Sequence, residues 1–359
     1  MTRMNMAARF AGVNVSRITG FALVCLGLIG CAPAVLPVPL PEPPLPTPDP
    51  IPGEGNKDVR ASRLFVANFA GLNVVSYQDP WTVDGDVAPD TNLQGAQTQL
   101  LSPLDLTVDN SGALSVVNQG ARSITSYADA DTADGDLAPD RNVKGPASLL
   151  VTPRAMAHQP VGDLMFVLDD LRVINVFGDV STAVFDEGAA PIRTIDPGAV
   201  LVRPMAMCFG DHDDLYVADD AGFIYVFAHA STLDRVVVPT RTIESPKAVD
   251  VFVERSSDTM FVVETTGFVY TYHDAATLDG AVEPDAKFQV PGAASLQSIA
   301  VDSHGTGYIV DALTNAIYSY DDVAELDGFV APDRTIRGPR TRLNQPLEVY
   351  VFEEPSEVE

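Results

Sequence analysis

The chain has 359 residues, of which 46% are hydrophobic, so it is long and apolar enough to bury a large core. Its 49 acidic residues outnumber 22 basic ones and give a formal net charge of −27. This charge repels nucleic acid and anionic lipid and argues against both as electrostatic partners. It favours cations and basic proteins, although solubility alone also explains it. Only three cysteines are present, which excludes a disulfide framework.

Residues 1–30 have the features of a secretory signal. Arg3, Arg9 and Arg17 form a basic start without any acidic residue, and residues 18–30 form an uncharged apolar run. A membrane-spanning helix needs about 20 apolar residues, so this run is too short to span comfortably. Its length is typical of the hydrophobic region of a signal peptide.

The signal ends in Leu28-Ile29-Gly30-Cys31, which resembles the lipobox of bacterial lipoproteins. That resemblance implies cleavage before Cys31, diacylglyceryl transfer to its thiol and acylation of its amine, for example with palmitate. Several acyl chains anchor a protein stably to a membrane. Ala32, rather than Asp, resembles the pattern of outer-membrane lipoproteins, so we expect a lipid anchor in the bacterial cell envelope, on either face. The alternative is a secreted protein with an incidental cysteine.

Residues 31–62 form a predicted linker, and almost half of residues 32–53 are proline. Proline fixes the backbone φ angle and lacks an N–H donor, so this segment cannot join a helix or a sheet. An extended spacer of this length would reach about 60 Å at about 3.1 Å per residue.

Residues 63–353 repeat a pattern of short β-strands. Aromatic residues end one strand of each copy, at positions 77, 127, 177, 227, 272 and 320. A fixed period near 50 residues is typical of propellers and related arrays. Each copy contains four predicted strands, a to d, and an Asp-Gly…Ala-Pro-Asp segment joins c to d in the regular copies. Copies starting at Phe177 and Phe227 are degenerate.

The repeat is out of phase at its two ends. The first copy lacks strand a, and an unaccompanied strand a lies at residues 346–352. The C-terminal strand can therefore complete the first blade and close the ring, which removes long exposed sheet edges. We predict an all-β, six-bladed propeller of four-stranded blades over residues 63–353, followed by an acidic tail at 354–359.

Two segments, 203–227 and 296–320, resemble NHL repeats, in which a Pro-x-Gly-Ile-Ala-Val-Asp strand leads to Leu-Tyr-Val-Ala-Asp. The chain lacks the glycine of that pattern and has Asp105, Ala155, Ala206, Ala248, Ser298 and Glu348 there. The resemblance implies a propeller, and such propellers serve as lactonases, lyases and binding platforms, so the fold does not choose among these activities.

Asp105 and Glu348 are candidate metal ligands. Both are the third residue of strand a, which lines the channel of a propeller, and ring closure makes their blades neighbours. Two carboxylates there could hold a hard cation such as Ca²⁺ or share a proton. They match loosely the Glu, Asp and Asn-type ligands of calcium-dependent propeller lactonases. Alternatively, they are a hydrated pair or bind Arg154 or Lys247.

Asp129, Asp131, Asp134 and Asp136 resemble part of an EF-hand calcium loop. Gly135 comes one place late for that motif, and no Glu ends the loop. The other copies keep Asp-Gly but lose the leading acids, so the shared part is predicted to be a tight turn in which Gly adopts a positive φ. A weak calcium loop remains the alternative for this copy.

The polar residues that end strand b are predicted to stabilise the following turns rather than to bind a ligand, since they recur in every copy. His158 is the only histidine well placed for a lyase-like base. The favoured function is a membrane-anchored binding or scaffolding module with an unidentified protein or small-molecule ligand. The alternative is a metal-dependent hydrolase of the gluconolactonase kind, with its site at the central channel.

Overall fold

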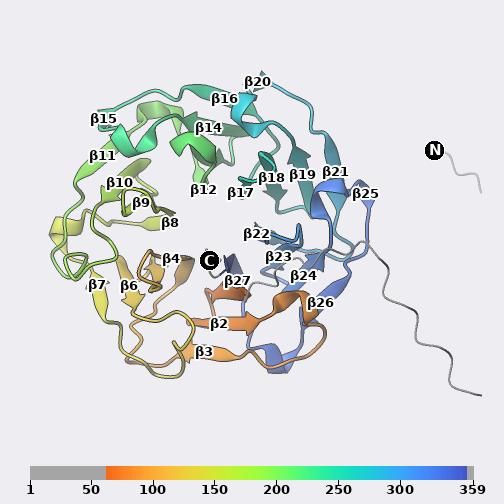
Figure 1. Ribbon diagram of the computed structural model, residues 1–359, viewed down its shortest axis with the longest axis horizontal. Helices are drawn as coiled ribbons and strands as arrows, with labels where there is room; N and C mark the ends of the chain where they lie inside the picture. The colour runs from red at the N-terminus through yellow and green to blue at the C-terminus, as the bar shows by residue number, and fades with distance from the viewer. Residues whose placement is uncertain (1–61, 354–359) are drawn as a thin grey trace, which may run out of the picture. The chain divides into compact units, whose positions relative to one another are not determined.

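The computed structural model describes residues 62–353, which form a six-bladed β-propeller (Figure 1). The predicted fold class is therefore confirmed. These residues contain short 3-10 turns but no α-helix, so within them no helix is long and apolar enough to span a membrane. The predicted signal peptide, Cys31, the linker up to residue 61 and the acidic tail lie outside the described residues.

Each blade is an antiparallel sheet of four strands, a to d from the axis to the rim, and we number the blades from the one that contains β1. Blade 1 consists of β27 (Pro346–Glu353), β1 (Ser62–Asn68), β2 (Asn73–Gln78) and β3 (Thr91–Gln94). Blade 2 consists of β4 (Pro103–Val108), β5 (Leu114–Asn118), β6 (Ser123–Tyr127) and β7 (Arg141–Val143). Blade 3 consists of β8 (Pro153–Gln159), β9 (Leu164–Asp169), β10 (Val173–Phe177) and β11 (Arg193–Asp196).

The remaining blades follow the same order. Blade 4 consists of β12 (Pro204–Phe209), β13 (Leu215–Asp219), β14 (Phe223–Phe227) and β16 (Arg241–Glu244). Blade 5 consists of β17 (Asp250–Glu254), β18 (Thr259–Glu264), β19 (Phe268–Tyr272) and β21 (Ala286–Gln289). Blade 6 consists of β22 (Leu296–Val301), β23 (Gly307–Asp311), β24 (Ala316–Tyr320) and β26 (Arg334–Arg337).

The hydrophobic core lies between the blades. Strands b and c are apolar on both faces because each sheet is covered by a neighbouring blade on either side, and most of their residues are fully buried. The aromatic residues that mark the repeat are among the largest buried side chains: Tyr77, Tyr127, Phe177, Phe227, Tyr272 and Tyr320. One period of the sequence repeat therefore corresponds to one blade, and each blade contributes one of these aromatic side chains to the core.

Both ends of the domain build blade 1, as predicted. Strand β27 pairs with β1 from Ser62 opposite Glu353 to Asn68 opposite Pro346, with one irregularity near Asn68. The innermost strand of this blade thus comes from the C-terminus and its other three strands come from the N-terminus. Non-covalent pairing of the two ends closes the ring.

The segment between strands c and d reaches the preceding blade. Short strands in this segment, β15 (Arg235–Val236), β20 (Gly280–Ala281) and β25 (Gly328–Phe329), pair in parallel with the outer strands β11, β16 and β21. The aspartate just before each segment of parallel pairing accepts a backbone N–H from the outer strand of the preceding blade. Asp134 accepts the Asn92 N–H in this way at 2.7 Å. Equivalent acceptors are Asp84, Asp186, Asp234, Asp279 and Asp327. We call this repeated contact the clasp.

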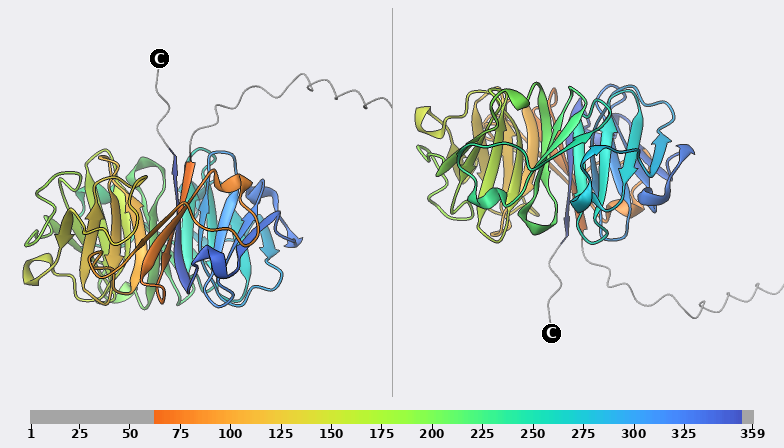
Figure 2. Two further views of the ribbon diagram at one scale, coloured as in Figure 1. Left: turned by 90° about the horizontal axis from the view of Figure 1, so that it is seen from below. Right: turned by 90° about the horizontal axis from the view of Figure 1, so that it is seen from above.

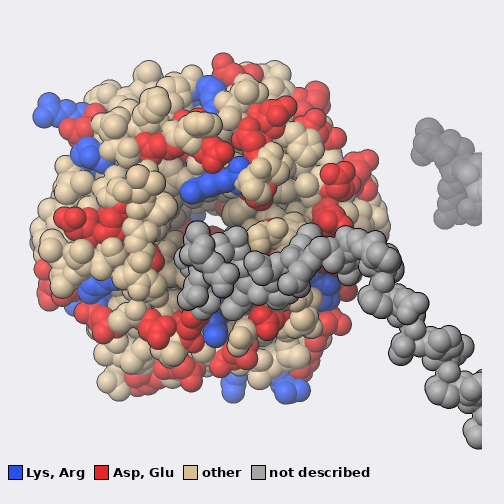
Figure 3. Space-filling model, viewed as in Figure 1, with Lys and Arg blue, Asp and Glu red and all other residues tan. Residues whose placement is uncertain are grey.

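The two faces of the ring differ in their connections. Strands a end, and β1 begins, on the face where Ser62 pairs with Glu353, which we call the exit face (Figure 2). The turns between strands b and c, and the loops that lead to strand a, lie on the opposite face. On the part of the exit face that Figure 3 shows, acidic side chains are more frequent than basic ones.

Candidate functional site: the central pocket

A cavity of about 560 Å³ lies at the centre of the ring. It is lined by the innermost strands and by the turns that follow them on the exit face. The channel lining predicted for strand a is therefore correct. At its deep end lie three carboxyl groups, and nearer the mouth lie further acidic residues: Glu254, Asp302 and Glu353.

Asp105, Asp250 and Glu348 hold the same register position in three different blades. Each pairs with the residue before the polar end of strand b, namely Val117, Val263 and Ala67. The predicted equivalent in the fifth blade, Ala248, is therefore wrong. Most other inner strands begin at a proline. In the fifth blade, Pro246 comes two residues before the position that those prolines occupy. Strand pairing, not the proline, sets the register.

Hydrogen bonds hold each of these carboxyl groups against a neighbouring blade. Asp105 Oδ2 accepts the Met156 N–H at 2.6 Å, and Asp250 Oδ2 accepts the Ile299 N–H at 2.8 Å. Glu348 Oε1 accepts the Ser298 hydroxyl at 2.8 Å. The three acids therefore join blades as well as facing the pocket.

Burial raises the pKa of all three groups, because a charged carboxylate loses its hydration inside the ring. The pKa of Asp105 rises to about 8, with donation from Met156 opposing the rise and the charge of Asp250 adding to it. The pKa of Asp250 rises to about 7 despite the Ile299 N–H. Burial raises the pKa of Glu348 well above its usual range, and repulsion from Asp105 and Asp250 raises it further. These raised pKa values favour protonated carboxyl groups near neutral pH.

Other titratable groups in the pocket are less suited to chemistry. Burial lowers the pKa of His158, and its Nε2 atom lies 3.7 Å from Asp163 Oδ1 without a hydrogen bond among the described residues. Burial raises the pKa of the Cys208 thiol, which disfavours its reactive thiolate. Arg255 lies near the mouth and donates to the Phe209 carbonyl at 3.2 Å.

The four aspartates of the predicted calcium loop have separate partners. Asp134 forms the clasp to Asn92, Asp136 Oδ1 accepts the Gln97 N–H at 2.7 Å, and Asp131 pairs with Arg63 at 3.0 Å. Asp129 accepts the N–H of Asp131 at 3.0 Å. Within residues 62–353, no three His, Cys, Asp or Glu side chains are grouped so that they could hold a metal ion. Calcium binding, here or at Asp105 and Glu348, remains a prediction.

Three of the six polar residues that end strand b, all aspartates, stabilise the following turn as expected, whereas Glu264 accepts the Tyr270 hydroxyl instead. Asp169 accepts the backbone N–H groups of Val151, Thr152 and Leu171 at 2.9–3.0 Å. Asp219 and Asp311 make corresponding contacts. Arg154 pairs with Asp170 at 2.5 Å, rather than with Asp105 or Glu348.

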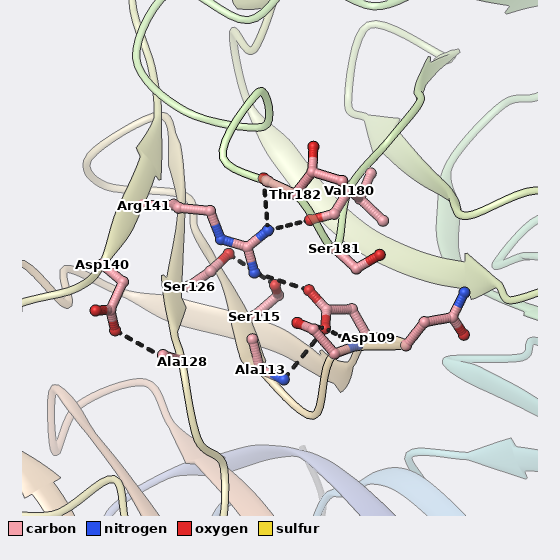
Figure 4. Close-up of polar contacts among 12 residues, drawn as sticks. Asp109, Ala113, Ser115, Ser126, Ala128, Asp140, Arg141, Val180, Ser181 and Thr182 are labelled. Carbon is pink, nitrogen blue, oxygen red and sulfur yellow. Dashed lines mark hydrogen bonds and ion pairs between the residues drawn. The ribbon is translucent and has the colours of Figure 1, made fainter.

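An arginine at the start of strand d joins blades 2 and 3 (Figure 4). Arg141 Nη2 donates to Asp109 at 2.8 Å, and Nη1 donates to the carbonyls of Val180 and Thr182 in the next blade. Arg241 makes the same type of contact between blades 4 and 5, through Asp214 and two carbonyls. This arginine was not singled out from the sequence.

Sequence reasoning also missed Asp250, although a signal was present. Asp105 is followed by Leu-Thr-Val-Asp, and Asp250 by Val-Phe-Val-Glu, so both begin the pattern Asp-apolar-x-Val-acid. When the copies are aligned on this pattern of apolar and acidic residues instead of on the proline, Asp250 falls at the same position as Asp105.

Comparison with known proteins shows the fold alone. No protein-family model matches the sequence, and no curated protein does. A chain in the crystal structure of a nidogen/laminin complex is similar, with a TM-score of 0.54 and 13% identity over 81% of this chain and 98% of that one. The WD40 β-propeller domain of Doa1 has a TM-score of 0.46 and 11% identity over 69% of this chain and 72% of that one.

Proposed function

We propose that this propeller is a binding module whose central pocket takes a cationic ligand. The observation that carries the proposal is the convergence of Asp105, Asp250 and Glu348 at the deep end of a pocket of about 560 Å³. Arg255 is the one Lys or Arg among the residues that line this pocket. A cation bound beside the three carboxyl groups is stabilised by their negative charge. Ion pairing is strong there because the surroundings have a low dielectric constant.

Ligand binding should be coupled to proton release. The raised pKa values keep these carboxyl groups largely protonated in the empty pocket near pH 6. A cation favours their charged form and so displaces protons. Affinity should therefore increase as the pH rises through about 7 to 8, the values for Asp250 and Asp105. Exposed carboxylates are already ionised at pH 6 and would not produce this dependence.

Calorimetric titration of the full chain with spermidine at pH 6 and pH 8.5 tests the proposal. We expect affinity at least about tenfold higher at pH 8.5, because a group with a pKa near 8 is mostly ionised only there. The variant Asp105→Asn/Asp250→Asn/Glu348→Gln should bind weakly at both pH values. Asp322→Asn, which removes one charge from an exposed loop outside the pocket, is the matched control. Equal affinity in the triple variant and wild type would refute a site at the channel carboxylates.

A metal-dependent hydrolase or lactonase is the second candidate. Asp105, Asp250 and Glu348 line one pocket and offer the carboxylate oxygens that Ca²⁺ prefers, but as they lie they are not grouped closely enough to hold a metal ion, so calcium would have to draw them together. Titration with calcium chloride, followed by thermal melting, separates the two candidates. A melting temperature raised by calcium and unaffected by spermidine would favour the hydrolase. The reverse pattern would favour the binding module.

We further propose that the propeller is a lipoprotein of the bacterial envelope, of the outer membrane in particular, and that its blades are NHL-like. The lipobox-like residues before Cys31 and the proline-rich segment up to residue 62 support the anchor. Because the chain enters the ring at Ser62, this linker joins the propeller on the exit face, where the central pocket opens.

A further inference from the structure

Exposed apolar side chains are concentrated around the outer edge of blade 3. Two shallow hollows, of about 650 and 490 Å³, share Leu149 and Thr194 and are therefore continuous. Exposed apolar residues line them, which we call the blade 3 tract: Leu149, Val151, Leu171, Ile192 and Val236. Contiguous apolar surface of this kind on a soluble domain marks an interaction site.

The tract arises where the repeat departs from its own pattern. Ile192 follows Ala-Pro, where four other copies have an aspartate: Asp90, Asp140, Asp285 and Asp333. Each of those aspartates accepts a backbone N–H at the start of the same loop. In the next copy, Arg235-Val236 replaces the Gly-Asp, Gly-Ala or Gly-Phe of the regular copies. These changes remove internal contacts and add exposed apolar surface.

Arg235 has a backbone conformation that suits glycine. Its φ angle is +63°, and the corresponding glycines at 85, 135, 280 and 328 have φ angles from +65° to +83°. A side chain at such a position strains the backbone. The Arg235 side chain is 89% exposed, and its one ion pair, with Asp234, is 3.5 Å long. Little within the described ring compensates this strain, which points to an external role for the side chain.

Arg193, in the second hollow, lacks the partners of its counterparts. Like Arg141 (Figure 4) and Arg241, it begins a strand d. Its Nε and Nη2 atoms are buried and have no hydrogen-bond partner among the described residues. A buried guanidinium without acceptors is unfavourable.

We propose that the blade 3 tract is the contact surface between two copies of this chain, related by a two-fold axis. The tract carries both signs of charge, from Arg193 and Arg235 and from Asp196 and Asp234. A two-fold contact brings each residue opposite the same surface of the partner, so the arginines of one copy can meet the aspartates of the other. With a net charge of −27, two copies repel each other over most of their surface, and the mixed charge of this tract makes it the face for close approach.

Disulfide trapping with a matched control tests the contact. Val236 in β15 and Phe329 in β25 occupy the same place two clasps apart and are 76% and 71% exposed. We expect Val236→Cys, in the purified full chain, to form a disulfide-linked dimer under mild oxidation. Phe329→Cys should stay monomeric on a non-reducing gel. Equal cross-linking at both positions, or none at either, would overturn the proposal.

Sedimentation of the uncrosslinked full chain provides an independent measurement, in about 0.5 M salt to screen the net charge. Wild type and Phe329→Glu should sediment as dimers, and Val236→Glu as a folded monomer. A monomeric wild type, including one in which the tract binds another protein or residues 1–61, would contradict the proposal. A dimer that persists in Val236→Glu would also contradict it.

Discussion

Arg235 shows how one side chain can be unfavourable for the stability of its own fold. A left-handed backbone costs a non-glycine residue about 1–2 kcal/mol, and glycine loses about 0.4–1 kcal/mol through the greater freedom of the unfolded chain. Arg235→Gly should therefore stabilise the monomer by about 0.5–1 kcal/mol, measured by urea unfolding in dilute solution. Arg235→Ala keeps the Cβ atom and should give no such gain. A gain of the same size in both variants would show that loss of the arginine side chain, rather than backbone strain, is responsible.

The channel carboxyl groups should make stability depend on pH in an unusual direction. Their folded-state pKa values lie above the unfolded values near 4. The folded state therefore binds more protons, so its stability is fully present below about pH 4 and is lost as the pH rises through about 7 to 8.

Between pH 5.5 and 8.5, we expect wild type to lose on the order of 5 kcal/mol of unfolding free energy. Asp105→Asn/Asp250→Asn/Glu348→Gln should remove most of this pH dependence, as measured by urea unfolding at both pH values. An identical pH dependence in the triple variant would mean that other groups cause it.

At this scale the sequence was informative about types of residue and weaker about register. Asp105 and Glu348 were placed correctly in the channel because their strands begin at a proline in register with the repeat. Asp250 was missed because the repeats were aligned on their prolines, and the proline of the fifth blade is out of register with the others. Only strand pairing determines the correct register. The raised pKa values could not be predicted, because burial depends on how all six blades meet.

At the scale of the elements, the clasp is the recurring device that joins blades. Asp279 Oδ1 accepts the Thr242 N–H of the preceding blade at 2.9 Å. A hydrogen bond to a charged group is worth about 1.5–3 kcal/mol, and less where solvent competes. We expect Asp279→Ala to destabilise the domain by about 1 kcal/mol, measured by urea unfolding. Asp279→Asn keeps an oxygen acceptor and should retain most of the stability, whereas equal losses in both variants would argue against the clasp.

The Asp-Gly segment was predicted as a tight turn, and its glycines do adopt positive φ angles. The prediction of a turn is nevertheless wrong, because these glycines pair with the outer strand of the adjacent blade instead. Turn chemistry is local and can be read from a few residues. The clasp joins Asp134 to Asn92, and similar sequence separations recur between other blades. Only the packed ring brings such residues together. The apolar substitutions at Ile192 and Val236 were visible in the sequence but could not be placed on one surface.

For the whole molecule, the closure of the ring was predictable because the missing first strand and the unaccompanied last strand are complementary. The lipid anchor stays a prediction. Replacement of Cys31 by Ser should move the protein from the membrane fraction to the soluble fraction after cell lysis, because the lipidated thiol is lost. Immunoblotting of the two fractions measures this change. A Cys31→Ser protein that remains in the membrane fraction would exclude lipidation as the anchor.

The pairing of β1 with β27 has a consequence for the order of events in biosynthesis. The innermost strand of blade 1 spans Pro346–Glu353, so the ribosome makes it after the other strands of the ring. Until then β1 lacks its inner neighbour, and the nascent chain has an open edge at blade 1. Such long-range pairing also folds slowly, because the ends of the domain must find each other. In the proposed envelope lipoprotein, a late-closing ring would give the export system time to capture the chain while it is still unfolded, and it would leave prematurely terminated chains open to proteases.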